Sequence, residues 1–288
     1  MLVDRVEIRG ERAVAVRLAA PGQRIEAGMI VLAAGAYGSA PILLRSGIGP
    51  AEEIREAGIR PVLDLPGVGR GLIDHPGASL AIVAPVGSPT RPVYQSVVTL
   101  RSRGADPEGA PDLQLFAPGA WGSEMSPTGL VASLVASVVR PVSRGRLWLR
   151  SADPADPPRI VLGHLREDHD LRRMIEAMRE LHRVASTPPL AALAGPDTVL
   201  SPGPEVWEDD ESLGAWLRAS VWTYHHPVGT CRMGPDPDSG AVVDPSGRVH
   251  GVEALAVVDA SVMPDIPSAN TNLPTIMMGE RLAVALAS

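Results

Sequence analysis

The 288-residue sequence contains no lysine, one cysteine and few aromatic residues, and each shortage excludes some chemistry. Without lysine there can be no lysine Schiff base, no Walker-type phosphate loop and no lysine general base. The lone Cys231 cannot form an internal disulfide or a multi-cysteine zinc site. It suits a reducing compartment, so we expect a cytoplasmic protein. Aromatic residues make up 3%, so we expect an aliphatic core.

Charge and hydropathy exclude two further classes of protein. The net charge of −7 argues against a nucleic-acid-binding protein, which needs a basic surface to neutralise phosphates. No apolar run reaches the roughly 18–20 residues that span a bilayer, so no transmembrane segment is expected. The histidines do not follow metal-ligand spacing, so no metal site is expected.

The first part of the chain predicts short strands and helices. Residues 2–18 alternate apolar and polar side chains and predict a hairpin, while the apolar run 29–34 predicts a strand buried on both faces. Ser39 is expected to cap a short helix, and a second short helix is expected over 50–58. Residues 66–77 are crowded with glycine and hold two prolines, so we expect a loop there.

The middle of the chain predicts a mostly antiparallel sheet flanked by helices. Strand-like stretches separated by turns occupy residues 78–150, and the valine-rich run LVASLVASVV is interpreted as a strand. Residues 168–186 carry apolar side chains at helical spacing and predict the clearest helix. Residues 188–206 are rich in proline and are expected to be irregular, and another helix is expected over 210–220.

Four segments combine glycine, histidine or asparagine with the ends of predicted strands and helices. In chain order, the first to fourth segments are residues 31–49, 65–77, 224–234 and 257–283. The first runs from a buried strand through glycine into a helix start, which suits a phosphate or flavin edge but is common in any α/β fold. The second either brings backbone close to a ligand or forms a plain turn with His75 at the surface.

The third and fourth segments carry the candidate catalytic groups. Adjacent side chains usually diverge, so His225 and His226 are a poor pair for one metal ion. One of them is better interpreted as a general base, although a lone histidine is more often structural. In the fourth segment an apolar strand leads to Asp259, and a final helix begins near Pro274. The polar residues before that helix either cap it or bind a ligand.

In this order the four segments resemble the glucose–methanol–choline (GMC) family of flavin oxidoreductases. The first is similar to the second signature of that family, although Ala40 stands where proline is usual and Pro41 follows. The second resembles VG-x-N-L-x-DH with Gly71 in place of asparagine. The third resembles HPVGT-x-RMG, and the fourth resembles D-A-S-x-x-P followed by N-T-N-x-P-T. The stretches PDLQ and GRLWLRSADP extend the resemblance over the whole chain.

The resemblance implies a mixed α/β fold with two domains. Residues 1–77 and 226–288 would form an incomplete, Rossmann-like FAD-binding domain. Residues 78–225 would form a substrate-binding domain with a mostly antiparallel sheet flanked by helices. The implied reaction is oxidation of the CH–OH group of a small-molecule alcohol, with FAD as cofactor.

The resemblance also implies roles for individual residues. His226 would accept the alcohol proton while a hydride passes to flavin N5, and Asn272 would hold the substrate oxygen. The other residues expected to lie beside FAD are Ala33, Ala34, Gly35, Asp74, His75, Asp259, Ala260, Asn270, Thr271, Pro274 and Thr275.

The dinucleotide fingerprint G-x-G-x-x-G of this family is absent from the sequence. Gly47 with Gly49, and Gly67 with Gly69, lack the third glycine and the strand-to-helix context. Two hypotheses follow. The chain is the catalytic part of a flavin-dependent alcohol oxidoreductase whose first βαβ unit lies elsewhere, or it is a non-catalytic fragment that cannot hold FAD without a partner chain. The electron acceptor is left open among oxygen, a quinone and a redox partner protein.

Overall fold

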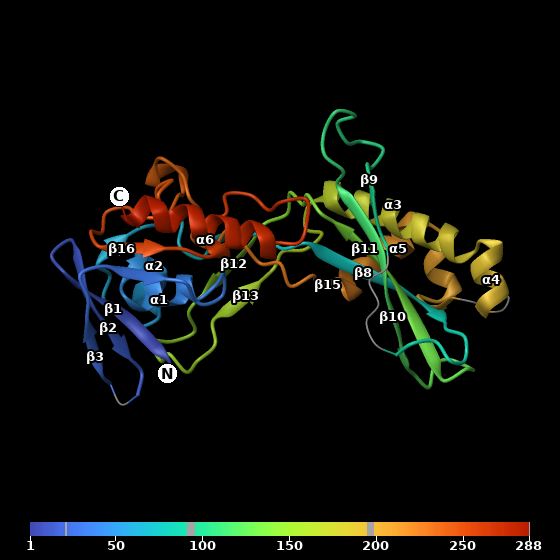
Figure 1. Ribbon diagram of the computed structural model, residues 1–288, viewed down its shortest axis with the longest axis horizontal. Helices are drawn as coiled ribbons and strands as arrows, with labels where there is room; N and C mark the ends of the chain where they lie inside the picture. The colour runs from blue at the N-terminus through green and yellow to red at the C-terminus, as the bar shows by residue number, and fades with distance from the viewer. Residues whose placement is uncertain (21, 91–95, 195–198, 288) are drawn as a thin grey trace. The chain divides into compact units, whose positions relative to one another are not determined.

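The computed structural model describes residues 1–20, 22–90, 96–194 and 199–287, which divide into two compact units (Figure 1). Unit 1 comprises Met1–Asp74, Arg144–Gly163 and His226–Ser288, and unit 2 comprises His75–Ser143 and His164–His225. The sequence placed residues 78–225 in one domain, whereas Arg144–Gly163 belongs to unit 1 because its strands pair there. The predicted mixed α/β class with largely antiparallel sheets is confirmed.

Unit 1 is built on small sheets around an aliphatic core. The predicted hairpin is confirmed, and a third strand extends it into an antiparallel sheet. Two further strands pair in parallel, and the prediction that the first of these is buried on both faces is wrong, since Val31 is 47% exposed. The strands named here are β1 (Val3–Arg9), β2 (Arg12–Leu18), β3 (Arg24–Glu26), β4 (Ile30–Leu32) and β16 (Leu255–Val257).

The predicted loop at 66–77 contains a strand, so that prediction is wrong. The strand β7 (Arg70–Leu72) pairs with β12 (Gly145–Trp148), which pairs in turn with β13 (Arg159–Val161). The first strand of unit 2, β8 (Pro76–Val83), begins at Pro76. Glycine permits the pairing, because Gly69 has φ +78° and a Cβ there would collide with the Leu147 carbonyl. The remaining strands of unit 1 are β5 (Ile48–Gly49) and β6 (Leu63–Asp64).

The helices of unit 1 begin close to the predicted positions. The cap prediction for Ser39 is wrong: Gly38 is the N-cap, and the Ser39 hydroxyl donates to the Asp259 carboxylate inside the unit. The final helix begins at Asn272, with Pro274 in its first turn, where a missing N–H costs little. These helices are α1 (Ser39–Arg45), α2 (Ala51–Glu56), α6 (Asn272–Ala287) and the 3₁₀ turns η2 (Pro237–Ser239) and η3 (Ala260–Val262).

Unit 2 contains a six-stranded antiparallel sheet in the order β14-β8-β11-β10-β9, with β15 also paired to β8. The run LVASLVASVV forms β11, as predicted, since its β-branched side chains suit a central strand between β8 and β10. The strands are β8 (Pro76–Val83), β9 (Val97–Leu100), β10 (Leu113–Gly122), β11 (Leu130–Val138), β14 (Val199–Ser201) and β15 (Trp222–Thr223).

Helices pack on the sheet of unit 2. The predicted helix at 168–186 is confirmed, and its buried face includes Met174 and Met178. The predicted irregular stretch at 188–206 contains a helix, a 3₁₀ turn and a strand, because its prolines stand where a helix start tolerates them; residues 195–198 lie outside the described residues. The helices are α3 (Asp168–Ala185), α4 (Pro188–Ala194), η1 (Pro204–Trp207) and α5 (Asp210–Ser220).

A buried ionic cluster is part of unit 2. The Arg173 guanidinium lies between the carboxylates of Asp112 and Asp170 and also donates to the Arg140 carbonyl oxygen at 2.9 Å. Burial alone would raise the pKa of Asp170, but hydrogen bonds from Ser143, from the Val142 backbone and from Arg173 outweigh it and hold the pKa below its usual range. The cluster therefore ties α3 to two loops of the sheet.

Candidate active site

The carboxyl ends of β4 and β16 lie side by side in unit 1, because the two strands are parallel neighbours. Residues 33–35 follow β4, and residues 258–260 follow β16. Asp259 joins them: one carboxylate oxygen accepts from the Gly35 N–H at 2.9 Å and from the Ser39 hydroxyl, and the other accepts from the Ser261 N–H at 2.8 Å. The first and fourth segments therefore meet at the edge where ligands of parallel sheets usually bind.

The second and third segments pair with each other. Ile73 and Val228 exchange two backbone hydrogen bonds of 3.0 and 2.9 Å. At the neighbouring position Gly229 has φ +85°, and a Cβ there would lie 2.6 Å from the Gly71 carbonyl oxygen. Glycine is thus required for the two backbones to cross this closely.

The third segment also contacts the first and the fourth. The Cys231 N–H donates to the Ser261 carbonyl at 2.9 Å, and the Thr230 hydroxyl donates to the Ala36 carbonyl at 2.7 Å. The four segments singled out in the sequence therefore meet in unit 1, apart from residues 75–77 and 224–225, which belong to unit 2. Burial, assisted by the Asp259 charge, raises the pKa of the Cys231 thiol well above its usual range, so this thiol is not a nucleophile at neutral pH.

His226 lies at the start of the third segment and is only partly buried. Its backbone N–H donates to Asp74 Oδ1 at 2.9 Å, and its Nε2 lies 3.3 Å from Asn270 Nδ2. When the Asn270 amide donates this hydrogen bond, the lone pair is on Nε2, as a general base requires. This geometry makes Nε2 the candidate proton acceptor.

The structure brings Asn270 to His226, a contact that the sequence did not predict. The predicted partner, Asn272, is the first residue of α6 and is exposed. Spacing alone could not separate the two asparagines, because both stand in the loop and helix start that follow η3. The two carboxamides are therefore both candidates for orienting a substrate.

The other predicted site residues differ in burial. Asp74 is 2% exposed and His75 is 0% exposed, so the alternative of a plain turn with His75 at the surface is wrong. The His75 ring belongs to unit 2 and meets the Tyr224 ring edge-on. Thr271 is buried, and its carbonyl accepts from the Thr275 hydroxyl at 2.7 Å. The more accessible members of the set are Ala33, Ala34, Gly35, Ala260, Pro274 and Thr275.

Tyr37 is a residue near the site that the sequence analysis did not single out. Burial, together with the charge of Asp74, raises the pKa of Tyr37 to about 12, so the phenol stays protonated and can donate. A signal was present, because Tyr37 is one of three tyrosines and stands inside the first segment.

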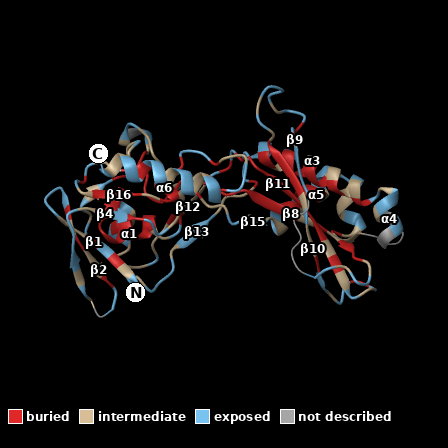
Figure 2. Ribbon diagram, in the orientation of Figure 1, coloured by how far each residue is buried: buried red, intermediate tan, exposed pale blue. Residues whose placement is uncertain are grey.

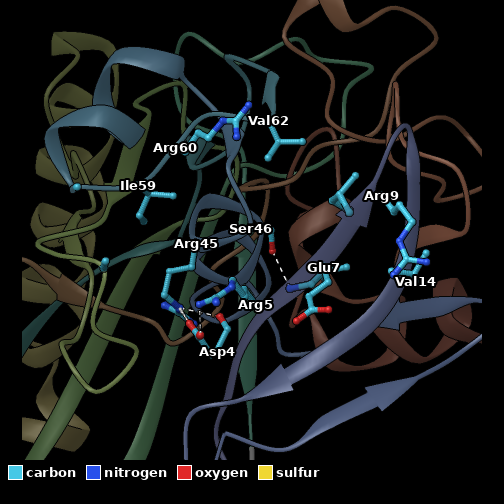
Figure 3. Close-up of a pocket in the computed structure, with 14 residues that line it drawn as sticks. Asp4, Arg5, Glu7, Arg9, Val14, Arg45, Ser46, Ile59, Arg60 and Val62 are labelled. Carbon is cyan, nitrogen blue, oxygen red and sulfur yellow. Dashed lines mark hydrogen bonds and ion pairs between the residues drawn. The ribbon is translucent and has the colours of Figure 1, made fainter.

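A cavity of about 610 Å³ lies along β1 and is lined by both charged and apolar side chains. Several of these side chains are drawn in Figure 3. Arg45 Nε donates to the Asp4 carbonyl at 2.8 Å, and Ser46 Oγ accepts from the Val6 N–H at 2.8 Å. These groups close the edge of β1. None of the predicted site residues lines this cavity, so it is separate from the candidate site. Within the described ranges, no cluster of three or more histidine, cysteine or acidic side chains suits a metal ion, and no helix is long and apolar enough to cross a bilayer.

Comparison with known proteins identifies the family. Two family models, both described as GMC oxidoreductase, match residues 1–77 and 141–279. The chain belongs to the GMC oxidoreductase family. The resemblance seen in the sequence is confirmed, and the two matches together include the first three segments and residues 257–279 of the fourth.

Individual GMC relatives match nearly the whole chain. The 5-(hydroxymethyl)furfural oxidase of Methylovorus sp. (strain MP688) is 38% identical over 91% of this chain and 51% of its own length. Oxygen-dependent choline dehydrogenase 1 of Chromohalobacter salexigens is 35% identical over 97% of this chain and 55% of its own length. The crystal structure of pyridoxine 4-oxidase from Mesorbium loti superimposes with a TM-score of 0.84 at 29% identity, covering 98% of this chain and 56% of that one. The chain thus spans about half the length of the relatives it matches.

Proposed function

We propose that this chain is the catalytic part of an FAD-dependent oxidoreductase that oxidises the CH–OH group of a small-molecule alcohol. The observation that carries the proposal is the convergence of the four GMC segments, with His226 Nε2 beside the Asn270 carboxamide. The names of the relatives refer to hydroxymethylfurfural, choline and pyridoxine, each of which is an alcohol. In this proposal unit 1 is the FAD-binding domain and unit 2 the substrate-binding domain.

The residues at the carboxyl ends of β4 and β16 suit the flavin part of FAD. Ala33 and Ala34 are small and exposed there. The fourth segment leads into the 16-residue helix α6, which begins directly after Thr271 and whose N-terminus carries the positive end of the helix dipole. We assign residues 33–35, 259–260 and 270–275 to FAD contacts, together with Asp74 and His75. When bound, FAD supplies the acceptor for the hydride that leaves the alcohol carbon.

The side chains of the site would move and orient the substrate proton. His226 Nε2 accepts the hydroxyl proton; because this nitrogen has a single lone pair, the substrate hydroxyl takes the place of the Asn270 amide there. The Asn272 carboxamide, assisted by Asn270, donates to the substrate oxygen and holds the hydroxyl toward His226. The contacts of the substrate hydroxyl with His226 and Asn272 would therefore determine which hydroxyl group loses its proton.

The pyrophosphate part of FAD needs residues beyond these. The Gly35 N–H is already bonded to Asp259, so this turn does not offer that donor to a phosphate. We propose that the missing contacts come from the polypeptide that makes up the other half of the GMC relatives. Exposed apolar side chains on α6 suit such a partner: Leu273 is 74% exposed and Val284 73%, in a helix whose one buried residue is Leu282. Figure 2 shows α6 coloured mostly as exposed and intermediate.

A reconstitution experiment tests this proposal. The purified chain is mixed with FAD, alone and after co-expression with the N-terminal half of the Methylovorus 5-(hydroxymethyl)furfural oxidase. We expect protein-bound flavin absorbance with the added half and little without it. Met277→Glu, on the exposed side of α6, should prevent assembly because it places a charge in an apolar interface. Val86→Glu, on an 82% exposed side chain of unit 2, should not.

Two outcomes of the reconstitution contradict parts of the proposal. A mixture that stays colourless supports the alternative of a non-catalytic fragment. Equal assembly of both charged variants places the partner elsewhere on the chain. The cytoplasmic location and the electron acceptor stay predictions: the first rests on the lone cysteine, and the second is open among oxygen, a quinone and a redox partner.

A further inference from the structure

Pro227 limits the backbone hydrogen bonds that can form beside His226. Pro227 follows His226 and has no N–H, so the N–H of His226 is the last backbone donor before Val228. A residue before proline is also confined to extended conformations. The contact made by the His226 N–H therefore helps to fix the backbone from which the ring projects.

That N–H is bound by a side chain at a position between two backbone contacts. Ile73 and Val228 exchange backbone hydrogen bonds in both directions, and further along the chain the Tyr224 N–H donates to the His75 carbonyl at 3.1 Å. Between these positions Asp74 Oδ1 accepts from the His226 N–H at 2.9 Å. The carboxylate thus supplies the partner of the His226 N–H where the direct backbone pairing is interrupted.

Because Asp74 is buried, its carboxylate depends on hydrogen bonds inside the protein. Asp74 is 2% exposed, and a buried carboxylate is costly unless it is hydrogen-bonded. An N–H bound to an ionised oxygen makes a stronger hydrogen bond than one bound to a neutral oxygen. On the other side of His226, the ring Nε2 meets Asn270 Nδ2. The histidine is therefore held at its backbone by Asp74 and at its ring by Asn270.

We propose that Asp74 is the positioning residue of His226. Its carboxylate anchors the His226 backbone so that the ring presents an unprotonated Nε2 toward Asn270 and the substrate. The proposed function places Asp74 beside FAD, and the positioning of His226 is a further role for the same side chain. The inference rests on the proposed function for the identity of the base, but the anchoring itself can be measured without flavin.

The test uses this chain labelled with ¹⁵N-histidine, which gives seven histidine amide signals. His226→Gln identifies the His226 signals. In the wild type we expect a downfield His226 amide proton that exchanges slowly with solvent, and ring nitrogens of a single tautomer with Nε2 unprotonated. In Asp74→Ala the His226 amide should exchange at least ~10-fold faster, since its acceptor is gone, and the ring should become a mixture of tautomers. In Asp74→Asn, which keeps an oxygen acceptor but loses the charge, both effects should be smaller than in Asp74→Ala.

Two controls separate anchoring from general loosening of the fold. His250, whose Nε2 lies 2.9 Å from the Gly234 carbonyl oxygen, should keep its signals in every variant. Asp4→Asn alters another buried carboxylate of unit 1, one that pairs with Arg45, and should leave His226 unchanged. If Asp74→Ala disturbs His250, Asp74→Glu replaces it, because that variant keeps the charge but displaces the carboxylate and should still mix the tautomers.

The proposal is overturned by either of two results. In the first, the His226 signals are unchanged when Asp74 loses or displaces its carboxylate. In the second, Asp74→Asn disturbs them as much as Asp74→Ala while His250 is unaffected. Failure of the proposed function looks different, because the anchoring signals would persist while His226→Ala left flavin reduction unchanged.

Discussion

Replacing His226 with alanine is expected to slow flavin reduction by the alcohol ~10²–10⁴-fold in the reconstituted flavoprotein, while FAD stays bound. The reason is local: His226 Nε2 is the proposed proton acceptor, and without it the hydroxyl proton has no nearby base when the C–H bond breaks. Anaerobic stopped-flow absorbance measures the rate, and the flavin spectrum of the resting protein measures cofactor content.

His225→Asn is the matched control for that variant. His225 is exposed and has φ +61°, a conformation that asparagine adopts more readily than most residues. We expect its rate to stay within ~3-fold of wild type, because surface substitutions that keep the backbone conformation have small effects. Equal rates in His226→Ala and the wild type would remove His226 from the mechanism.

Replacing Arg173 with alanine is expected to destabilise unit 2 by about 3–5 kcal/mol, because it leaves two buried carboxylates facing each other without a counter-charge. The side chain of Arg173 is 7% exposed, and those of Asp112 and Asp170 are 6% and 0% exposed. Urea unfolding followed by circular dichroism measures the loss. Arg183→Ala removes an exposed pair from the same helix and should cost less than about 1 kcal/mol.

The same cluster predicts a direction for the pH dependence. The folded pKa values of Asp112 and Asp170 lie below their ordinary value of 3.8, so their contribution to stability is present above about pH 4. It is lost as the pH falls through the lowered folded values. If the urea midpoint of unfolding were the same for Arg173→Ala and Arg183→Ala, the claim that the buried cluster stabilises unit 2 would be contradicted.

Local patterns allowed part of the fold to be predicted from the sequence. The hairpin β1–β2 and the helix α3 follow from the spacing of their apolar residues, which a short window contains. The strand at Arg70–Leu72 could not be predicted in this way, because its glycines signal a loop and its partner β12 lies far along the chain. Ser39 is a similar case, since Asp259 competes for its hydroxyl from 220 residues away.

The candidate site, like the fold, could be predicted only in part from the sequence. Order and spacing were enough to group the four segments and to select His226. They could not reveal that Asn270 faces His226, that Asp74 binds its backbone, or that Tyr37 lies under the influence of the Asp74 charge. Each of these depends on a contact between segments, and a single sequence carries no record of such contacts.

The most direct test of the account is amide hydrogen exchange of the reconstituted protein with and without FAD, followed by mass spectrometry. The account predicts that FAD slows exchange in residues 31–36, 257–262 and 270–275 of unit 1, where β4, β16 and α6 present the GMC segments. Protection confined to the cavity along β1, or to unit 2, would contradict it.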